Sequence, residues 1–256
     1  TASYKYKGFE DFRGGGHFSG RITAALVAVG AVLMKALEDK GIYIGTHIKQ
    51  CYDILDREFD VYEDDIEKLS TKVFPVLDED VSSRMIECIE NIALEGDSVG
   101  GILETAIIGI PKGVGEPWFD SVESVLSHGL FSIPAVKGVE FGKGFEMALL
   151  KGSEANDAFR YDGDKVITLS NNNGGINGGI TNGMPILFKT VIKPTPSIFK
   201  TQDTVDFIKG ENTQLSLQGR HDPAIIHRAR VVVDAMVAIA LADLLTVRFG
   251  TDYLGE

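Results

Sequence analysis

The amino-acid sequence predicts one layered domain of mixed α/β or α+β type, in which helices and strands share a common core. Its 256 residues, 44% of them hydrophobic and 24% charged, have the size and composition of a globular domain at the upper end of the usual length. Apolar helical stretches and short β-branched runs follow one another without a strict βαβ rhythm, and glycine-rich loops stand at the strand ends. We therefore expect residues 1–256 to form a single domain.

The first third of the chain predicts a helix, a strand and a surface excursion. Residues 22–37 are apolar nearly all round, which predicts a buried helix. Residues 41–48, "GIYIGTHI", supply the β-branched and aromatic side chains of a strand. Residues 53–80 are rich in acids, so we expect a solvated excursion there, including the stretch "YEDDIEKLS".

The middle of the chain repeats a helix-then-strand pattern. Helical spacing covers residues 82–96, and a strand is expected within 100–110, closed by the turn signals of "PKGVGEP". A helix over 119–130 then precedes a strand over 135–142.

The last third predicts an irregular loop, a strand and a long helix. Residues 170–183 are too rich in Gly and Asn for regular structure, whereas the alternation over 184–193 suits a strand with one buried face. The final helix is expected over 222–247, with Asp222 as its N-cap and Pro223 as its first residue.

Charge and hydropathy exclude several classes of protein. A net charge of −12 and a pI near 4.9 argue against a nucleic-acid binder. The longest uncharged apolar run, residues 22–34, is shorter than a membrane span, and the opening residues are polar and aromatic, unlike a secretory signal. We therefore expect a soluble, cytoplasmic protein without a membrane or nucleic-acid partner.

The cysteines and isolated histidines give no sign of a metal site. Cys51 and Cys88 stand far apart in the sequence and are expected to be free thiols of a reducing compartment. His47 and His128 stand alone and are expected to be packing or surface residues.

Three polar stretches could carry chemistry. "RGGGHFSGR", residues 13–21, precedes a helix, and helix N-termini flanked by arginines bind anions, although a glycine turn can also be purely structural. "KPTPSI", residues 193–198, combines a cation, two hydroxyls and two prolines, as a phosphate cradle or merely a stiff loop. "GRHDP", residues 219–223, brings Arg, His and Asp together at a helix start. No GxxxxGK[ST] or GxGxxG fingerprint is present, which argues against a P-loop or Rossmann assignment.

Six motifs in order give a more specific indication. "RGGGHFSGR", "AVKGVEFG", "GSE", "SNNNGGI" with "GGITNG", "KPTPSI" and "GRHDP" resemble the chorismate synthase family, from Tyr6 to about Leu245. The resemblance implies an α+β fold, a β-α-β sandwich with helices around an antiparallel-sheet core. It also implies a carbon–oxygen lyase acting on phosphates, which eliminates phosphate from 5-enolpyruvylshikimate 3-phosphate in a 1,4-anti manner to give chorismate. Reduced FMN as cofactor, a homotetramer and a possible separate flavin reductase belong to the same expectation.

The resemblance also assigns roles to individual residues. The flavin contacts that it implies are His17, Phe18, Ser19, Pro134, Ala135, Gly178, Lys193, Pro194, Thr195, Pro196, Ser197 and Arg220. The substrate-side positions are Ser19 and Arg21, to which we add Arg13 beside the glycines. Asp222 occupies the place of the aspartate that manages the proton on flavin N5, which makes it the expected catalytic residue.

Two departures from the family keep alternatives open. Many members have Arg-Ser-Ser where this chain has His17-Phe18-Ser19, and the family's amino-terminal portion, with two essential histidines, has no counterpart in this sequence. We expect the parent protein to be the enzyme and this piece to be a flavin- and phosphate-binding core with little turnover. The alternatives are an FMN-binding core without any turnover, and a flavin- or nicotinamide-dependent oxidoreductase, for which the dinucleotide fingerprint is missing.

Overall fold

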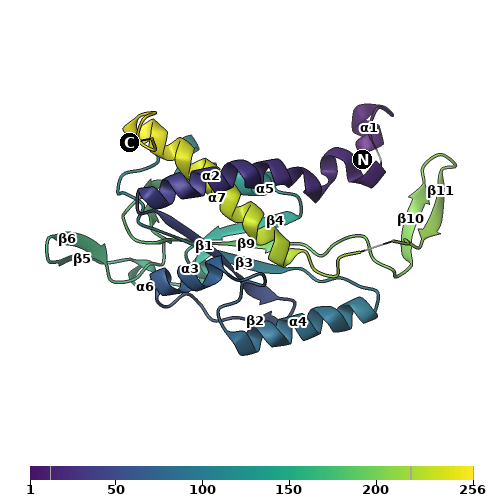
Figure 1. Ribbon diagram of the computed structural model, residues 1–256, viewed down its shortest axis with the longest axis horizontal. Helices are drawn as coiled ribbons and strands as arrows, with labels where there is room; N and C mark the ends of the chain where they lie inside the picture. Colours follow the sequence, from purple (N-terminus) through teal and green to yellow (C-terminus); the bar gives the residue numbers. More distant parts are fainter. Residues whose placement is uncertain (12, 220, 256) are drawn as a thin grey trace.

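A five-stranded antiparallel sheet forms the centre of the protein. The structure is a computed structural model that describes residues 1–11, 13–219 and 221–255. The strand order is β2-β1-β3-β9-β4. The bounds are β1 Tyr43–Cys51, β2 Ile54–Leu55, β3 Gly101–Ile108, β9 Ile186–Ile192 and β4 Val136–Phe141 (Figure 1).

Helices cover both faces of this sheet (Figure 1). The bounds of the helices on one face are α2 Ala24–Asp39, α5 Val122–Ser132 and α7 Ile226–Phe249. On the other face lies α3 Tyr62–Ser70, whereas α4 Glu79–Leu94 lies beside the edge strand β2 and adds Met85 to the main core. The prediction of an α+β fold with helices around an antiparallel sheet is therefore confirmed.

The remaining elements are short and lie at the margins of the sheet. Two hairpins, β5–β6 and β10–β11, project from opposite ends of the molecule (Figure 1). The bounds are α1 Ala2–Tyr6, η1 Arg13–Phe18, η2 Gly20–Thr23, η3 Trp118–Asp120, η4 Gly144–Leu149, α6 Gly152–Ala155, β5 Phe159–Asp162, β6 Lys165–Thr168, β7 Ile176–Asn177, β8 Ile180–Thr181, β10 Gln202–Asp206 and β11 Glu211–Leu215.

The two faces of the sheet differ in chemistry because side chains alternate along each strand. On β9, Ile186, Phe188 and Ile192 are fully or almost fully buried in the main core, under α5 and α7. The intervening Lys189 belongs to the opposite face, where it lies across from Glu104 of β3 and Glu140 of β4. One face is therefore a hydrophobic core, while the other carries charged groups. The predicted strands over 41–48, 100–110, 135–142 and 184–193 are all confirmed.

The prediction that residues 22–37 form a buried helix is half wrong. The helix forms, but α2 buries only Gly30 and Leu37, and Val32 stays 70% exposed. One face of α2 packs against α7, and no described element covers the other face. The helical segment also reaches from Gly20 to Asp39, longer than the expected 22–34, and is apolar enough to cross a membrane by length and composition alone, as core helices of soluble proteins also are.

The prediction of a solvated, acid-rich stretch is also wrong for residues 62–70. "YEDDIEKLS" is not a solvated stretch but helix α3, whose Ile66 and Leu69 are buried. Gly45 of β1 makes room for this helix, because a Cβ atom there would lie 2.6 Å from Cγ1 of Ile66. The short helix thus closes part of the charged face of the sheet.

The last helix begins later than the sequence suggests. Its N-cap is Ile225, so Asp222 and Pro223 precede the helix and neither caps it. The Asp222 carboxylate instead forms an ion pair with Arg228 in the first turn of α7. The Asp222 carboxylate thus pairs with an arginine side chain of the helix, instead of with the expected backbone N–H groups at its start.

Candidate functional site

Residues 193–197 leave the sheet directly after β9 and meet the start of β4. The backbone N–H of Lys193 donates to the carbonyl of Ala135 at 2.9 Å, which holds the two segments together. Ser98 Oγ donates to the carbonyl of Thr195 at 2.7 Å. A side chain at Gly100 would lie 2.9 Å from Cδ of Pro194, so glycine is required where the loop passes over the start of β3.

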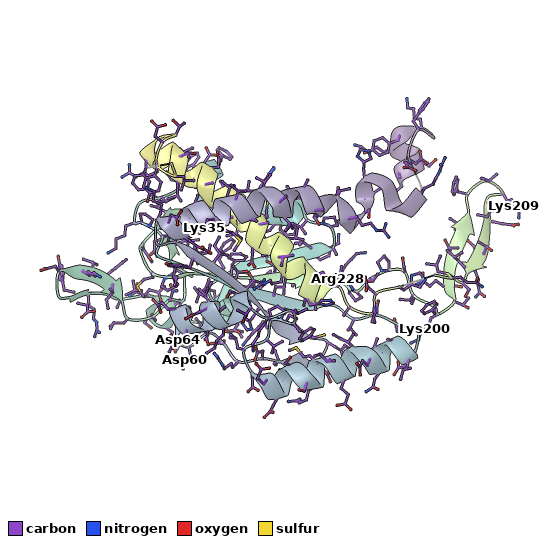
Figure 2. The ribbon with its side chains drawn as sticks, in the orientation of Figure 1. Lys35, Asp60, Asp64, Lys200, Lys209 and Arg228 are labelled. Atoms are coloured by element: carbon purple, nitrogen blue, oxygen red, sulfur yellow. The ribbon has the colours of Figure 1, made fainter. Side chains whose placement is uncertain are left out.

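The segment that carries Asp222 docks against the same place. Val99 N–H donates to the carbonyl of Pro223 at 2.7 Å, and the His221 ring lies edge-on to Phe199 with ring centroids 4.7 Å apart. Lys200, beyond the loop, pairs with Asp97 at 2.6 Å. Figure 2 shows Lys200 and Arg228 toward the end of the molecule from which β10 and β11 project.

We call the resulting group the proline-loop site; it consists of Pro134, Ala135, Lys193, Pro194, Thr195, Pro196, Ser197 and Asp222. These eight predicted residues are brought to one end of the sheet by the contacts of β3, β4 and β9. Ala135 adopts a φ of 76°, a left-handed conformation that is uncommon for residues other than glycine. These residues are therefore neighbours in the structure, and their role as a binding site stays a prediction.

Two buried polar atoms at the proline-loop site have no hydrogen-bond partner among the described residues. They are Oγ1 of Thr195 and Nε2 of His221. A buried polar group without a partner loses about 1–3 kcal/mol, so such groups in a native protein normally meet water or a ligand. The proline-loop site therefore has a hydroxyl and, beside it, an imidazole available to a polar ligand.

The imidazole of His227 follows in the first turn of α7. Burial and the neighbouring positive charge of Arg228 lower the pKa of His227, against the opposing effect of Asp222. Its Nδ1 is also buried without a partner in the described part of the chain. The neutral imidazole is thus favoured beside the site, where it can donate or accept a single hydrogen bond.

The glycine run forms a separate unit before α2. Gly15 and Gly16 have positive φ angles and permit two short 3₁₀ turns, and Ser19 Oγ accepts from the N–H of Arg21 at 3.2 Å. Phe18 contacts Tyr6, with ring centroids 6.4 Å apart. In Figure 1 this segment lies at the same end as the β10–β11 hairpin. Among the described residues, no hydrogen bond or ring contact joins Arg13, His17, Phe18 or Ser19 to the proline-loop site.

Gly178 lies at the opposite end of the sheet. It belongs to the turn between β7 and β8, with a φ of 60°, and this loop leads into the beginning of β9 at Ile186. The proline-loop site begins at the far end of β9, seven residues on, which is about 20 Å along an extended strand. Within one chain, Gly178 therefore does not join the proline-loop site. Arg220, the remaining predicted flavin contact, lies outside the described residues.

Sequence reasoning missed a buried network on the charged face of the sheet. His47 is fully buried, with Nδ1 2.9 Å from Oδ2 of Asp56 and Nε2 2.9 Å from Oε2 of Glu104. Burial opposes the charge, but the two carboxylate hydrogen bonds outweigh it and raise the pKa of His47. His47 is therefore not an isolated packing residue. The signal was a charged or ionisable residue in the middle of each of three apolar strands.

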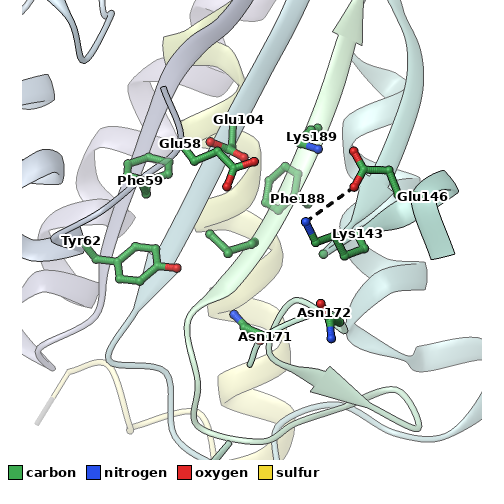
Figure 3. A pocket seen from close by; sticks show the side chains of 12 residues that line it. Glu58, Phe59, Tyr62, Glu104, Lys143, Glu146, Asn171, Asn172, Phe188 and Lys189 are labelled. Atoms are coloured by element: carbon green, nitrogen blue, oxygen red, sulfur yellow. Dashed lines mark ion pairs between the residues drawn. The ribbon is translucent and has the colours of Figure 1, made fainter. Parts of the chain in front are cut away.

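The missed network opens onto a cavity of about 160 Å³ (Figure 3). Its lining comes from α3, β3, β9 and the loops before and after them. The residues that line it are Glu58, Phe59, Tyr62, Glu104, Gly142, Lys143, Glu146, Asn171, Asn172, Leu187, Phe188 and Lys189. None of the predicted site residues lies in this cavity.

No group of three or more acidic, histidine or cysteine side chains suitable for a metal ion occurs in the part of the chain that the structure describes. Cys51 and Cys88 are both free thiols, as expected. The fold and the proline-loop site thus define an α+β protein with a candidate ligand site at one end of its sheet.

Comparison with known proteins gives the family. The chorismate synthase family profile matches residues 1–246. The chain is 44% identical to the chorismate synthase of Pyrococcus abyssi over 247 residues, covering 96% of this chain and 68% of the relative. It is 46% identical over 246 residues to that of Lachnoclostridium phytofermentans, covering 96% and 66%. A crystal structure of chorismate synthase matches with a TM-score of 0.78 and 30% identity, covering 98% of this chain and 71% of that one.

The chain belongs to the chorismate synthase family, and it spans about two thirds of the length of these relatives. Membership makes it a lyase of the shikimate pathway and of aromatic biosynthesis, acting on a small-molecule substrate with reduced flavin. A soluble protein agrees with the family and with the packing of α2 on α7. The comparisons support neither of the two alternatives considered from the sequence.

Proposed function

We propose that the protein converts 5-enolpyruvylshikimate 3-phosphate into chorismate and phosphate by 1,4-anti elimination, with reduced FMN bound at the proline-loop site. The observation that carries this assignment is the convergence of eight predicted residues at the end of β9, beside two buried polar atoms without partners in the described chain. The substrate bears a phosphate and two carboxylates, so its site needs fixed cations and hydrogen-bond donors.

The residues of the proline-loop site fit a flavin phosphate. The Lys193 ammonium supplies a positive charge, and the Thr195 hydroxyl supplies a buried donor that lacks an acceptor among the described residues. Pro134 and Ala135 would form one wall with Ser197 nearby, and Pro194 and Pro196 restrict the loop so that little conformational entropy remains to be lost on binding. The chemistry that bound reduced flavin supplies is electron density for the loss of phosphate, without net oxidation or reduction.

In this proposal, the Asp222 carboxylate takes up and returns a proton. Its Oδ2 accepts from Nη1 of Arg228, which orients the carboxylate. Oδ1 has no hydrogen-bond partner in the described part of the chain and is the atom that would take up or return the proton. Ser19 and Arg21, with Arg13, would bind the anionic groups of the substrate.

Association between copies would complete the site. Gly178 belongs to the same expected ligand site, yet within one chain it precedes β9 and the proline loop follows β9, whose extended length is about 20 Å. No hydrogen bond or ring contact between described residues joins Arg13, His17, Phe18 or Ser19 to the proline loop. A homotetramer in which different copies contribute different segments accounts for this separation. We further propose a single domain over residues 1–256, a cytoplasmic location and a separate enzyme that reduces the flavin.

The experiment combines turnover with FMN binding. The protein is incubated anaerobically with reduced FMN and 5-enolpyruvylshikimate 3-phosphate, and chorismate is followed by its ultraviolet absorbance. Thr195→Val should weaken FMN binding about tenfold, because one hydrogen bond to a charged group is lost. Thr204→Val, on the exposed hairpin strand β10, is the matched control and should bind FMN normally.

Asp222→Asn separates chemistry from binding. We expect it to retain FMN binding and to lose turnover. Unchanged FMN affinity in Thr195→Val, or full turnover in Asp222→Asn, would contradict the assignment of these roles. Chorismate formation without reduced flavin would contradict the proposed cofactor.

A further inference from the structure

In the cavity on the charged face of the sheet, the lysines have ion-pair partners, whereas two carboxylates keep oxygen atoms without a partner in the described chain. Its two lysines are already paired, Lys189 with Glu140 at 3.2 Å and Lys143 with Glu146 at 3.6 Å. Glu104 lies across from Lys189 in the sheet, yet the ammonium of Lys189 pairs with Glu140 on the other neighbouring strand. The positive charges at this cavity are therefore satisfied by the protein itself.

Two of the carboxylates are not satisfied in the same way. Glu104 gives one oxygen, Oε2, to His47, and its other oxygen has no hydrogen-bond or ion-pair partner among the described residues. Its side chain is only 9% exposed and lines the cavity. The carboxylate of Glu58 also lines the cavity and has no side-chain partner in the described chain. Both raise the pKa of Tyr62, after the larger effect of burial, so both lie near its phenol.

Aromatic rings form the adjoining wall. Phe59 and Tyr62 stack with ring centroids 5.9 Å apart, and Phe188 lines the cavity from β9. Figure 3 draws Glu58, Glu104, Phe59 and Tyr62 on one side of the view, opposite the ion pair of Lys143 and Glu146. Aromatic faces attract cations, particularly where water is partly excluded.

We propose that this cavity binds a small organic cation with a primary ammonium group, held by Glu58 and Glu104 against the rings of Phe59 and Tyr62. The volume of about 160 Å³ limits the ligand to about five water-sized groups. An anion would meet lysines that already have carboxylate partners. A bare metal ion would lack ligands, since the described residues offer no group of three suitable side chains. This site is independent of the proline-loop site and of the proposed reaction.

Three probes with the same carbon chain test the charge requirement. Butylammonium, 1-butanol and butyrate are titrated into the intact protein, and backbone amide signals are followed by NMR. Butylammonium should shift the amides of Lys143, Asn172 and Lys189 in a saturable manner. The affinity for 1-butanol should be at least about tenfold lower, and butyrate should not bind there. Equal affinity for all three probes, or no saturable shift at these amides, would overturn the proposal.

Two variants test the carboxylates. Glu58→Gln, at an exposed position, should weaken butylammonium binding about fivefold to tenfold, and Glu104→Gln should weaken it further. Glu90→Gln on the exposed side of α4 removes the same charge far from the cavity lining and should leave binding unchanged. Because Glu104 also bonds His47, its variant can unfold, in which case Glu58→Gln decides the outcome. Binding that is equal in wild type and Glu58→Gln would refute the assignment.

Discussion

The crossing of α2 and α7 depends on the absence of a side chain at Gly30. A Cβ atom there would lie 2.5 Å from Cα and 3.0 Å from the carbonyl oxygen of Ala235, and closer still to its Cβ. These are largely backbone atoms of a buried helix, so they cannot rotate away. Gly30→Ala should therefore push the two helices apart.

The expected magnitude is the difference of two opposing effects. Alanine in a helix interior is favoured over glycine by about 1 kcal/mol. Overpacking of a tight core contact destabilises by about 1–3 kcal/mol, and the upper half of that range applies where backbone must move. We therefore expect Gly30→Ala to lower the free energy of unfolding by about 1–2 kcal/mol, measured by urea denaturation followed by circular dichroism.

A matched glycine in α5 provides the control. A Cβ atom at Gly129 would meet Sδ of Met236 at 2.9 Å, the flexible end of a side chain that can turn aside. Gly129→Ala should be neutral or stabilising through helix propensity. Restoring room with Ala235→Gly should rescue Gly30→Ala at least in part. A Gly30→Ala protein as stable as the wild type would refute the argument from close helix approach.

Two further predictions concern buried charges. Burial raises the pKa of Asp234 to about 6, against the opposing effects of Arg230 and Thr46, and the carboxylate pairs with Arg230 at 3.2 Å. Asp234→Ala should therefore lower the free energy of unfolding by about 3 kcal/mol. Asp243→Ala, on the exposed side of the same helix, is the control and should lower it little. The raised pKa of His47 stabilises the fold below pH 6.5, and this contribution is lost as pH rises through the folded-state pKa. The difference in stability between wild type and His47→Gln should therefore shrink at high pH, as measured by urea denaturation midpoints across pH 5–9. A difference that grows with pH would contradict the protonated state of His47.

Local patterns were sufficient to predict most of the fold. Alternation along β9 and the glycine-bounded strands gave the sheet, because a strand with one buried face has a period of two. The burial of two helices was mispredicted for related reasons. Helix α3 is rich in acids, and only Ile66 and Leu69 form its apolar face, so its burial was not predicted. The apolar composition of α2 does not indicate how many elements pack against it. Burial depends on packing partners, which composition does not specify.

Only some of the predicted site residues lie close together in the structure. Residues close to one strand end, such as Ala135 and Lys193, were brought together by sheet pairing. Gly178 was grouped with them by resemblance, but the direction of β9 carries it to the other end. The His47 network could not be assigned, because Asp56 follows a two-residue edge strand and its pairing with His47 depends on the β1–β2 turn. Contacts between distant segments require the strand order, which no motif contains.

The row of alternating charges across the sheet has a consequence for folding. His47, Glu104, Lys189 and Glu140 stand opposite one another on four neighbouring strands, so each strand offers its neighbour an opposite charge at one position only. If β9 slipped by a single residue, Lys189 would turn toward the apolar helices and the Phe188 side chain would leave the main core. Such a misaligned sheet would bury an ammonium group among hydrocarbon side chains and leave Glu140 without its lysine partner. The same groups that line a cavity in the finished protein therefore discriminate against incorrectly paired chains while the sheet assembles.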